Sequence, residues 1–189
     1  TGIPFFLIRG NHETRGALAR KLSDYINLPE DKFYYSFSQG PVFFILLDSG
    51  EDKPDDNQYY FGLADFDRYR EKQADWLKEQ IESEAFRKAK FRVVLVHMPL
   101  YGGNDWHGEE VNRRLWGDLL NRAGIDLMIC GHTHRYDFHR KGDFANSFPL
   151  LIGAPRTGIL VSASQGELAV TVRTPEGEIL DEFSFEARK

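Results

Sequence analysis

The run FRVVLV, residues 91–96, decides how this chain is organised, because it stands between two helical patterns. Six residues so rich in apolar and β-branched side chains predict a strand that is buried on both faces. An apolar stripe at helical spacing predicts a helix over 64–86, and a second helix is expected over 109–124, ended by Gly124. Strands alternating with helices are typical of parallel pairing, so the centre of the chain predicts an α/β fold.

Further strands are expected on both sides of this unit. FYYSFSQGPVFFILLD, residues 33–48, predicts two strands around its Gly-Pro pair, and IDLMIC, residues 125–130, predicts another. Beyond Tyr136 the pattern changes to short strands and turns, and a Pro-Glu-Gly turn between two alternating runs predicts a hairpin. We therefore expect a single domain over 1–189 with two packed sheets.

The N-terminal part adds a strand, a helix and a loop to this expectation. IPFFLI, residues 3–8, predicts a strand buried on both faces. Apolar residues at helical spacing predict a helix over 14–26. The polar stretch 49–62 is expected to be a solvated loop, long enough to act as a lid.

Composition narrows the classes of protein to which the chain can belong. A hydrophobic content of 41%, a charged content of 28% and a net charge of −5 are typical of a globular domain and argue against a broad basic nucleic-acid interface. No run approaches the roughly 20 apolar residues that span a bilayer, so no membrane partner is expected. The single cysteine, Cys130, excludes an internal disulfide. The chain begins at Thr1 rather than at methionine, which leaves its compartment unknown.

Polar side chains follow the predicted buried strands at the points where those strands end. Because the carboxyl ends of parallel strands meet at one edge of a sheet, where open α/β sheets build their sites, we expect these side chains to gather. Four of the six histidines are among them. The residues concerned are Asn11, His12, Glu13, Asp48, His97, His132 and His134.

Within this group, four residues form a candidate metal site. His132 and His134 are two residues apart, so both rings point to the same side if the backbone is extended. Neutral imidazole nitrogens are good ligands for zinc, iron or manganese, and the Asn11 amide can add an oxygen. With His97 these residues make a metal constellation drawn from distant segments.

Each residue also has a plainer explanation when it is taken alone. A single His-x-His pair is a weak signal, and His97 could bond the backbone at its strand end. Asn11 precedes a predicted helix and could cap it. His107 is expected to be a solvated loop residue, and His139 an exposed strand residue.

Three short blocks resemble a known family. GNHE at 10–13, VHMPLY at 96–101 and GHTHRYD at 131–137 resemble, in order and spacing, three signature blocks of the calcineurin-like metallophosphoesterases. YYSFSQGPVFFILLDSG and QADWLKEQI are similar to segments of the purple acid phosphatase branch, and the resemblance covers roughly residues 4–155. It implies a partial metallophosphoesterase-type β-sandwich flanked by helices.

The resemblance also implies a metal-dependent hydrolase acting on small phosphate esters. In that family the centre contains two metal ions. Each is divalent or trivalent, and the metals are zinc, manganese or iron. Asn11, His97 and His132 correspond to ligands of one ion, and His134 to a ligand of the other.

The same comparison implies roles for three further residues. His12 corresponds to the histidine that faces the phosphate and leaving group, where it acts as general acid or electrostatic stabiliser. Glu13 or Asp48 could orient its ring, since such a histidine needs a hydrogen-bond partner to fix its tautomer.

The sequence departs from the family pattern at its beginning. An Asp-x-His block and a Gly-Asp-x-x-Asp (or Tyr) block should precede IPFFLI, but only eight residues precede Arg9, and none is Asp or His. We therefore expect this chain to be the C-terminal portion of a catalytic domain, missing its N-terminal strands, inactive alone and bound to one metal ion or none. The alternatives are a non-catalytic binding or structural module, or half of a split enzyme, with relic ligands. An unpaired 3–8 strand would favour a homodimer.

Overall fold

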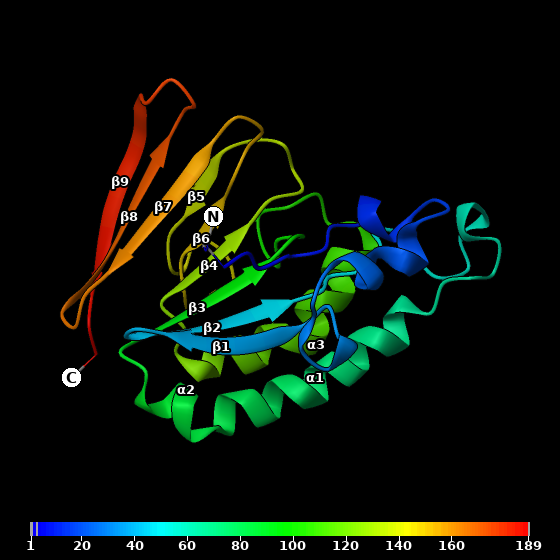
Figure 1. Ribbon diagram of the computed structural model, residues 1–189, viewed down its shortest axis with the longest axis horizontal. Coiled ribbons are helices and arrows are strands. Elements are labelled where there is room, and N and C mark those ends of the chain that lie inside the picture. The colour runs from blue at the N-terminus through cyan, green and yellow to red at the C-terminus, as the bar shows by residue number, and fades with distance from the viewer. Residues whose placement is uncertain (1, 3, 189) are drawn as a thin grey trace.

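The computed structural model describes residues 2 and 4–188, and its centre is a mixed sheet of six strands (Figure 1). The strands lie in the order β1-β2-β3-β4-β6-β5, and β2, β3, β4 and β6 are parallel to one another. The six strands are β1 (Tyr35–Gln39), β2 (Val42–Leu47), β3 (Phe91–Val96), β4 (Leu127–Cys130), β5 (Asp137–His139) and β6 (Leu150–Ile152). The predicted parallel α/β arrangement is confirmed.

A second, antiparallel sheet packs on one face of the first, as the sequence predicted (Figure 1). Val93 and Leu127 of the large sheet share a buried cluster with Val170 of the small one. The predicted hairpin is the β8–β9 pair. The small sheet consists of β7 (Gly158–Ala163), β8 (Glu167–Arg173) and β9 (Ile179–Glu186).

Helices cover the other face of the large sheet (Figure 1). Leu77 of α1 and Trp116 and Leu120 of α3 are fully buried there against β2, β3 and β4. Gly124 ends α3 in the left-handed conformation, as predicted. The helices are α1 (Phe66–Glu82), α2 (Glu84–Lys88) and α3 (His107–Ala123). In the part of the chain that the structure describes, none of them has the length and apolar character needed to cross a bilayer.

The predicted strand over 3–8 is wrong for residues 4–8, which form no regular element, while Ile3 lies outside the described residues. The backbone is held by a side chain instead of a neighbouring strand, because the Tyr35 hydroxyl donates a hydrogen bond to the Leu7 carbonyl at 2.9 Å. Phe6 stacks on Phe37 of β1 with ring centroids 4.1 Å apart.

The predicted helix over 14–26 is also wrong. This region contains the 3-10 turns His12–Thr14 and Ala19–Tyr25 and no α-helix. Only part of its expected apolar stripe is covered: Ile26 packs against the cluster around Tyr35, but Leu18 is 65% exposed and Tyr25 is 75% exposed. An amphipathic helix draws most of its stability from burying that stripe, so regular helix does not form here.

The loop over 49–62 is not uniformly solvated, which corrects the prediction for its first residues. Glu51 and Asp52 are buried. The fully buried Arg70 of α1 donates hydrogen bonds to the carbonyl oxygens of Ser49 and Glu51, which fixes this part of the loop against the helix. The loop also contains a 3-10 turn, Gln58–Tyr60.

Candidate functional site

Three ligand-type atoms meet at the carboxyl edge of the parallel strands. His97 follows β3 directly, and His132 follows β4 after one glycine. The Nε2 atom of His97 lies 3.1 Å from Oδ1 of Asn11 and 3.3 Å from Nδ1 of His132. Because β3 and β4 are parallel neighbours, the fold itself brings the two imidazoles together.

These separations fit a shared metal ion. Ligand atoms about 2.0–2.1 Å from zinc at tetrahedral angles lie roughly 3.3–3.4 Å from one another. The distances of 3.1 and 3.3 Å around His97 Nε2 are close to that size. Among the described residues, no three His, Cys, Asp or Glu side chains alone are arranged to hold an ion. An ion between the two imidazoles would therefore need the Asn11 amide oxygen as its third donor.

Burial keeps both histidines of the trio neutral. It lowers the pKa of His97, and it lowers the pKa of His132 to about 4, because protonating both neighbouring rings would also place two positive charges side by side. A neutral imidazole presents a lone pair to a cation, whereas an imidazolium does not. At neutral pH both rings are thus in the state that binds metal.

His134 differs from His132 in burial, and its backbone is not extended. Extended backbone was expected at both histidines, but His132 has φ = 72° and His134 has φ = 58°. Both residues are therefore in the left-handed region, and the two rings need not share a side. The side chain of His132 is 5% exposed, whereas His134 is exposed to solvent. The assumption of extended backbone at these two residues is therefore wrong, and a role for His134 as a ligand stays a prediction.

Asn11 is oriented by a carboxylate that the sequence analysis did not identify. Oδ2 of Asp52 lies 3.3 Å from the Asn11 side-chain nitrogen, and both side chains are buried. Oδ1 of Asp52 accepts from Lys53 at 2.7 Å and from Arg15 at 3.1 Å. Burial acts to raise the pKa of the Asp52 carboxyl, but these two cations lower it overall.

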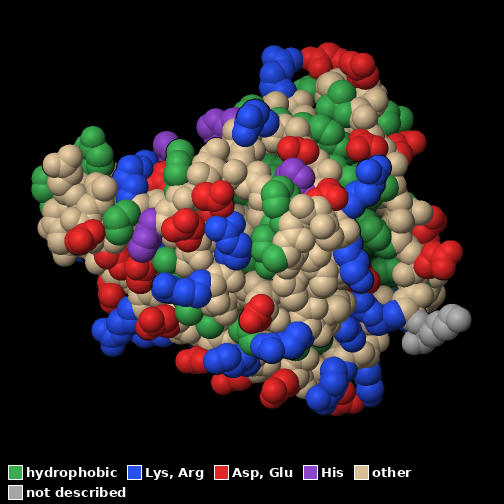
Figure 2. Space-filling model, turned by 180° about the vertical axis from the view of Figure 1, so that it is seen from behind, with side chains coloured by type: hydrophobic (Ala, Val, Ile, Leu, Met, Phe, Trp, Pro, Cys, Tyr) green, Lys and Arg blue, Asp and Glu red, His purple; other side chains and the backbone are tan. Residues whose placement is uncertain are grey.

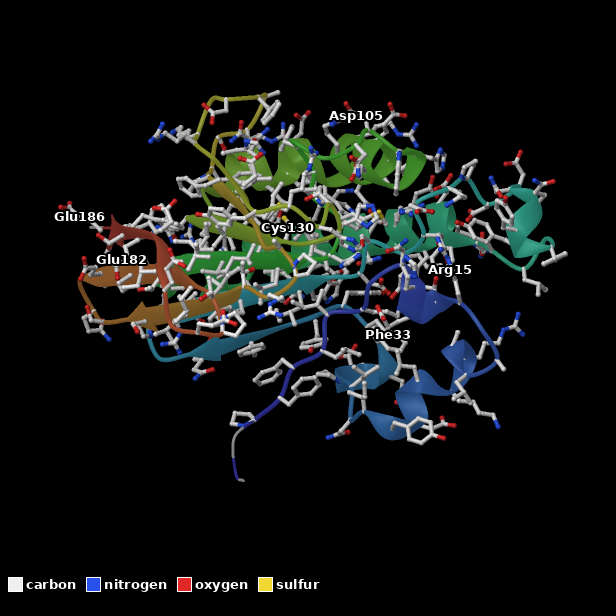
Figure 3. The ribbon with its side chains drawn as sticks, turned by 90° about the horizontal axis from the view of Figure 1, so that it is seen from above. Arg15, Phe33, Asp105, Cys130, Glu182 and Glu186 are labelled. Atoms are coloured by element: carbon white, nitrogen blue, oxygen red, sulfur yellow. The ribbon has the colours of Figure 1, made fainter. Side chains whose placement is uncertain are left out.

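The neighbouring Glu51 ties the same loop to the segment after Asn11. Its carboxylate accepts three hydrogen bonds from Arg15, at 2.9, 3.1 and 2.6 Å, and one each from Thr14 and Tyr60. Figure 3 places the Arg15 side chain between the N-terminal turns and the body of the fold. Glu51 and Asp52 stand in a polar stretch, where acidic residues normally indicate a solvated loop. The sequence therefore offers no sign that they are buried.

A second carboxylate that the sequence analysis missed lies beside His132. Oε2 of Glu109 accepts hydrogen bonds from the backbone nitrogens of Asn104, at 2.8 Å, and Trp106, at 3.3 Å. Oε1 lies 3.9 Å from Nε2 of His132, and neither atom has a hydrogen-bond partner in the described chain. Burial raises the pKa of Glu109.

The residues assigned to acid–base roles lie around this cluster. His12 and Glu13 are exposed, and Oε2 of Glu13 accepts from the Gly10 nitrogen at 2.9 Å. Asp48 is fully buried, and its carboxylate accepts from Arg9 and from the Tyr69 hydroxyl, the latter at 3.0 Å. Within the described residues neither carboxylate hydrogen-bonds His12, so the orienting role of Glu13 or Asp48 stays a prediction.

Two other histidines differ from expectation. His107 is the first residue of α3 instead of a solvated loop residue, and its Nε2 lies 2.8 Å from an Asp67 carboxylate oxygen. His139 lies in a strand, as predicted, but its side chain is only 15% exposed because it packs against Phe144. Neither residue joins the Asn11 cluster.

Comparison with solved structures shows where this fold occurs. The purple acid phosphatase PPD1 from yellow lupin (Lupinus luteus) superposes with a TM-score of 0.66 and 15% identity, over 94% of this chain and 37% of that one. GAP50, the anchor in the inner membrane complex of Plasmodium, superposes with a TM-score of 0.60 and 17% identity, over 84% of this chain and 56% of that one. The fold is therefore that of metallophosphoesterase-type proteins.

Sequence comparison gives the family. Purple acid phosphatase 18 of Arabidopsis thaliana is 25% identical over 160 residues, which are 77% of this chain and 33% of that protein. The human serine/threonine-protein phosphatase CPPED1 is 26% identical over 141 residues, which are 70% of this chain and 42% of that protein. The chain thus spans roughly a third to two fifths of the length of these relatives. The profile of the calcineurin-like phosphoesterases matches residues 1–136. Because this match covers well over half of the chain, the protein belongs to the calcineurin-like phosphoesterase family.

Proposed function

We propose that this chain carries part of the metal centre of an enzyme that hydrolyses phosphate esters. The observation that supports the proposal is the meeting of three donor atoms, Oδ1 of Asn11, Nε2 of His97 and Nδ1 of His132, at spacings that suit one ion. Its relatives include proteins named as phosphatases, in agreement with this activity.

The trio would hold one ion, and His134 would contribute to a second. A bound divalent ion would polarise a phosphoryl oxygen and lower the pKa of a bound water. All four side chains are neutral when they bind, so none offsets the repulsion between two dications as a bridging carboxylate does. We therefore propose that residues 1–189 alone bind at most one ion and do not turn over substrate.

His12 is the proposed proton donor of the complete centre. It directly follows Asn11 and is exposed, so its ring is accessible to a bound ester. It would give a proton to the oxygen of the departing alcohol, while Glu13, held by the Gly10 nitrogen, would orient the ring. Asp48 is the weaker candidate for this orienting role, because Arg9 and Tyr69 already occupy its carboxylate.

We propose small phosphate esters as the substrates, and no nucleic acid. The net charge is −5, and on the face of the described chain in Figure 2 acidic and basic side chains are interspersed without an extended basic area. Binding to a nucleic-acid backbone depends on clustered positive charge, which this face does not offer. We propose phosphomonoesters before phosphodiesters, because the similar proteins include purple acid phosphatases.

A second candidate is a non-catalytic module or one half of a split enzyme. The observation that favours it is the same neutral donor set, which lacks a bridging carboxylate. The two candidates differ in what they require. A split enzyme recovers turnover when a partner chain supplies the carboxylate blocks, whereas a structural module keeps its fold when His97 and His132 are replaced and never gains turnover.

Isothermal titration with Zn²⁺ and an assay with p-nitrophenyl phosphate test the proposal. We expect one Zn²⁺ per chain, no turnover, and loss of binding in His97→Ala and His132→Ala chains. His139→Ala is the matched control, because this histidine lies outside the cluster and should leave binding unchanged. Turnover that disappears with His132→Ala would refute the inactive-fragment proposal, and unchanged zinc binding in both cluster variants would refute the metal site.

Self-association through the N-terminal segment is a separate proposal. Phe5 is 76% exposed and Phe6 is 43% exposed, so this extended segment presents apolar surface that a second copy could cover. Light scattering across the micromolar range tests it: a dimer that Phe5→Ser weakens is expected, and a monomer at every concentration would rule it out.

A further inference from the structure

Two buried polar atoms that face each other without a partner lie beside the metal-binding trio. Nε2 of His132 and Oε1 of Glu109 are 3.9 Å apart. The His132 side chain is 5% exposed and the Glu109 side chain 1% exposed, and neither of these two atoms has a hydrogen-bond partner among the described residues. Leaving a buried polar group without a partner is unfavourable, so two such groups in mutual reach are expected to pair.

The gap between the two atoms is too short for a bridging water. Two hydrogen bonds of about 2.8 Å through one water oxygen need donor and acceptor roughly 4.6 Å apart. A direct hydrogen bond instead needs the separation to shrink by about 1 Å, to about 2.9 Å. A small rotation of the His132 ring or of the Glu109 carboxylate achieves this.

The loop before α3 holds the Glu109 carboxylate so that only Oε1 is free to accept a hydrogen bond from His132. Oε2 is already taken by the backbone nitrogens of Asn104 and Trp106. Gly103 closes over the group so tightly that a Cβ there would lie 2.5 Å from Oε1. The Trp106 ring meets the His132 ring edge to face at 5.2 Å and limits its movement. Because Oε2 already accepts two hydrogen bonds, a further donor must bind to Oε1.

We propose that Glu109 positions His132 by accepting the proton of its Nε2–H group at Oε1. This hydrogen bond fixes the tautomer with the proton on Nε2 and leaves the lone pair of Nδ1 directed at His97 Nε2, where the trio meets. Carboxylates that hold the far nitrogen of a ligating histidine in this way raise its basicity and fix its orientation. Glu109 touches no substrate in this role and is a positioning residue. Only the effect on metal affinity rests on the proposed function, because the tautomer is a property of the metal-free chain.

The isosteric change Glu109→Gln tests the proposal sharply. The backbone nitrogens of Asn104 and Trp106 require an oxygen at the Oε2 position, so the new amide group presents its NH₂ to His132. Nε2 must then accept, and the proton moves to Nδ1, the atom that should bind metal. Glu110→Gln is the matched control, because it removes the same charge from the next, exposed residue of α3.

The first measurement is the tautomer of His132 in the metal-free chain at mildly alkaline pH. Two-bond ¹H–¹⁵N correlations distinguish protonated from unprotonated ring nitrogens, and a His132→Asn chain assigns the signals. We expect Nε2–H in the wild-type and Glu110→Gln chains and Nδ1–H in the Glu109→Gln chain. Nδ1–H in the wild-type chain, or the same tautomer with and without Glu109, would overturn the proposal. The wild-type spectrum alone decides if the variant does not fold.

The second measurement is Zn²⁺ affinity by isothermal titration. We expect the Glu109→Gln chain to bind about 10- to 100-fold more weakly than wild type, and the Glu110→Gln chain to match wild type. If the wild-type chain binds no zinc but the tautomer changes as expected, the positioning role stands and the proposed metal site is wrong. If zinc binds but Glu109→Gln changes neither affinity nor tautomer, the positioning role is wrong and the metal site stands.

Discussion

The Oδ2 atom of Asp52 lies 3.3 Å from the side-chain nitrogen of Asn11, and both residues are buried. An amide has a donor end and an acceptor end, so donating to Asp52 turns the Asn11 oxygen toward Nε2 of His97, 3.1 Å away. Asp52 thus decides which end of Asn11 the candidate metal site receives. Without this carboxylate, either end of the amide could face the imidazoles.

Asp52→Ala should weaken Zn²⁺ binding about 10-fold, because Asn11 loses the partner that orients it. The variant should also lose roughly 1–3 kcal/mol of stability, since it leaves buried donors unpaired. Calorimetric titration and urea denaturation measure the two effects. Asp56→Ala, which removes an exposed carboxylate from the same loop, is the control. Equal zinc affinity in the two variants would show that Asn11 needs no such partner.

Arg70 is expected to be the main support of the loop that carries Asp52. Its fully buried guanidinium donates to the carbonyl oxygens of Ser49 and Glu51 and pairs with Asp67. Arg70→Met keeps an unbranched apolar stem but removes the guanidinium and leaves these groups unpaired, so we expect a loss of about 2–4 kcal/mol in urea denaturation. Arg68→Met, at an exposed position on the same helix, should change stability by less than about 0.5 kcal/mol. A loss of similar size in both variants would contradict this assignment.

Stability should fall as the pH drops from about 6.5 to about 4. Burial lowers the pKa of His132 to about 4, whereas an unfolded histidine titrates near 6.5. Between these values the unfolded chain binds a proton that the folded chain does not, so acid favours unfolding. The contribution is about 2–3 kcal/mol across the window. Urea denaturation at a series of pH values should show a shallower slope for His132→Asn. An equal slope in that variant would mean that His132 does not cause the acid sensitivity.

The parallel strands were predictable because strands covered on both faces leave continuous apolar runs in the sequence. β3 and the end of β2 are such runs, and both are buried in the structure. The segment 14–26 failed for a physical reason. Helical spacing shows which residues would share a face, but Leu18 and Tyr25 have no surface to pack against. Whether such a surface exists depends on the rest of the fold, which periodicity does not reveal.

The candidate site was predictable only as far as its direct donors. His97 and His132 follow strands that the sequence indicates correctly, and the parallel pairing of β3 with β4 brings them together, whereas Asn11 follows a segment that the sequence wrongly indicates as a strand. Asp52 and Glu109 carried no such signal. Asp52 lies in a polar loop, and Glu109 lies in the first turn of α3. Acidic residues in a first turn are usually solvent-exposed and interact favourably with the helix dipole. Their burial follows from tertiary contacts with Arg15 and with the loop before α3.

Gly108→Ala should destabilise the protein although it adds a better helix former to α3. In an open helix the change would stabilise by about 1 kcal/mol. Here the new Cβ would overlap the Glu51 carbonyl oxygen and come within 3.0 Å of Nη2 of Arg70. That oxygen belongs to backbone held by Arg70, and the Gly108 nitrogen itself donates to the Asp52 carbonyl at 3.1 Å, so the loop cannot move away cheaply.

The clash should outweigh the gain in helix propensity, with a net loss of about 2 kcal/mol in thermal or urea denaturation. Zinc affinity should fall as well, because the displaced loop carries Asp52 and through it orients Asn11. Gly166→Ala is the control, since a Cβ there has no neighbour within 4 Å and its φ is not positive. If Gly108→Ala proved as stable as the wild-type chain, the Glu51 carbonyl would not pack against Gly108 as closely as the structure describes.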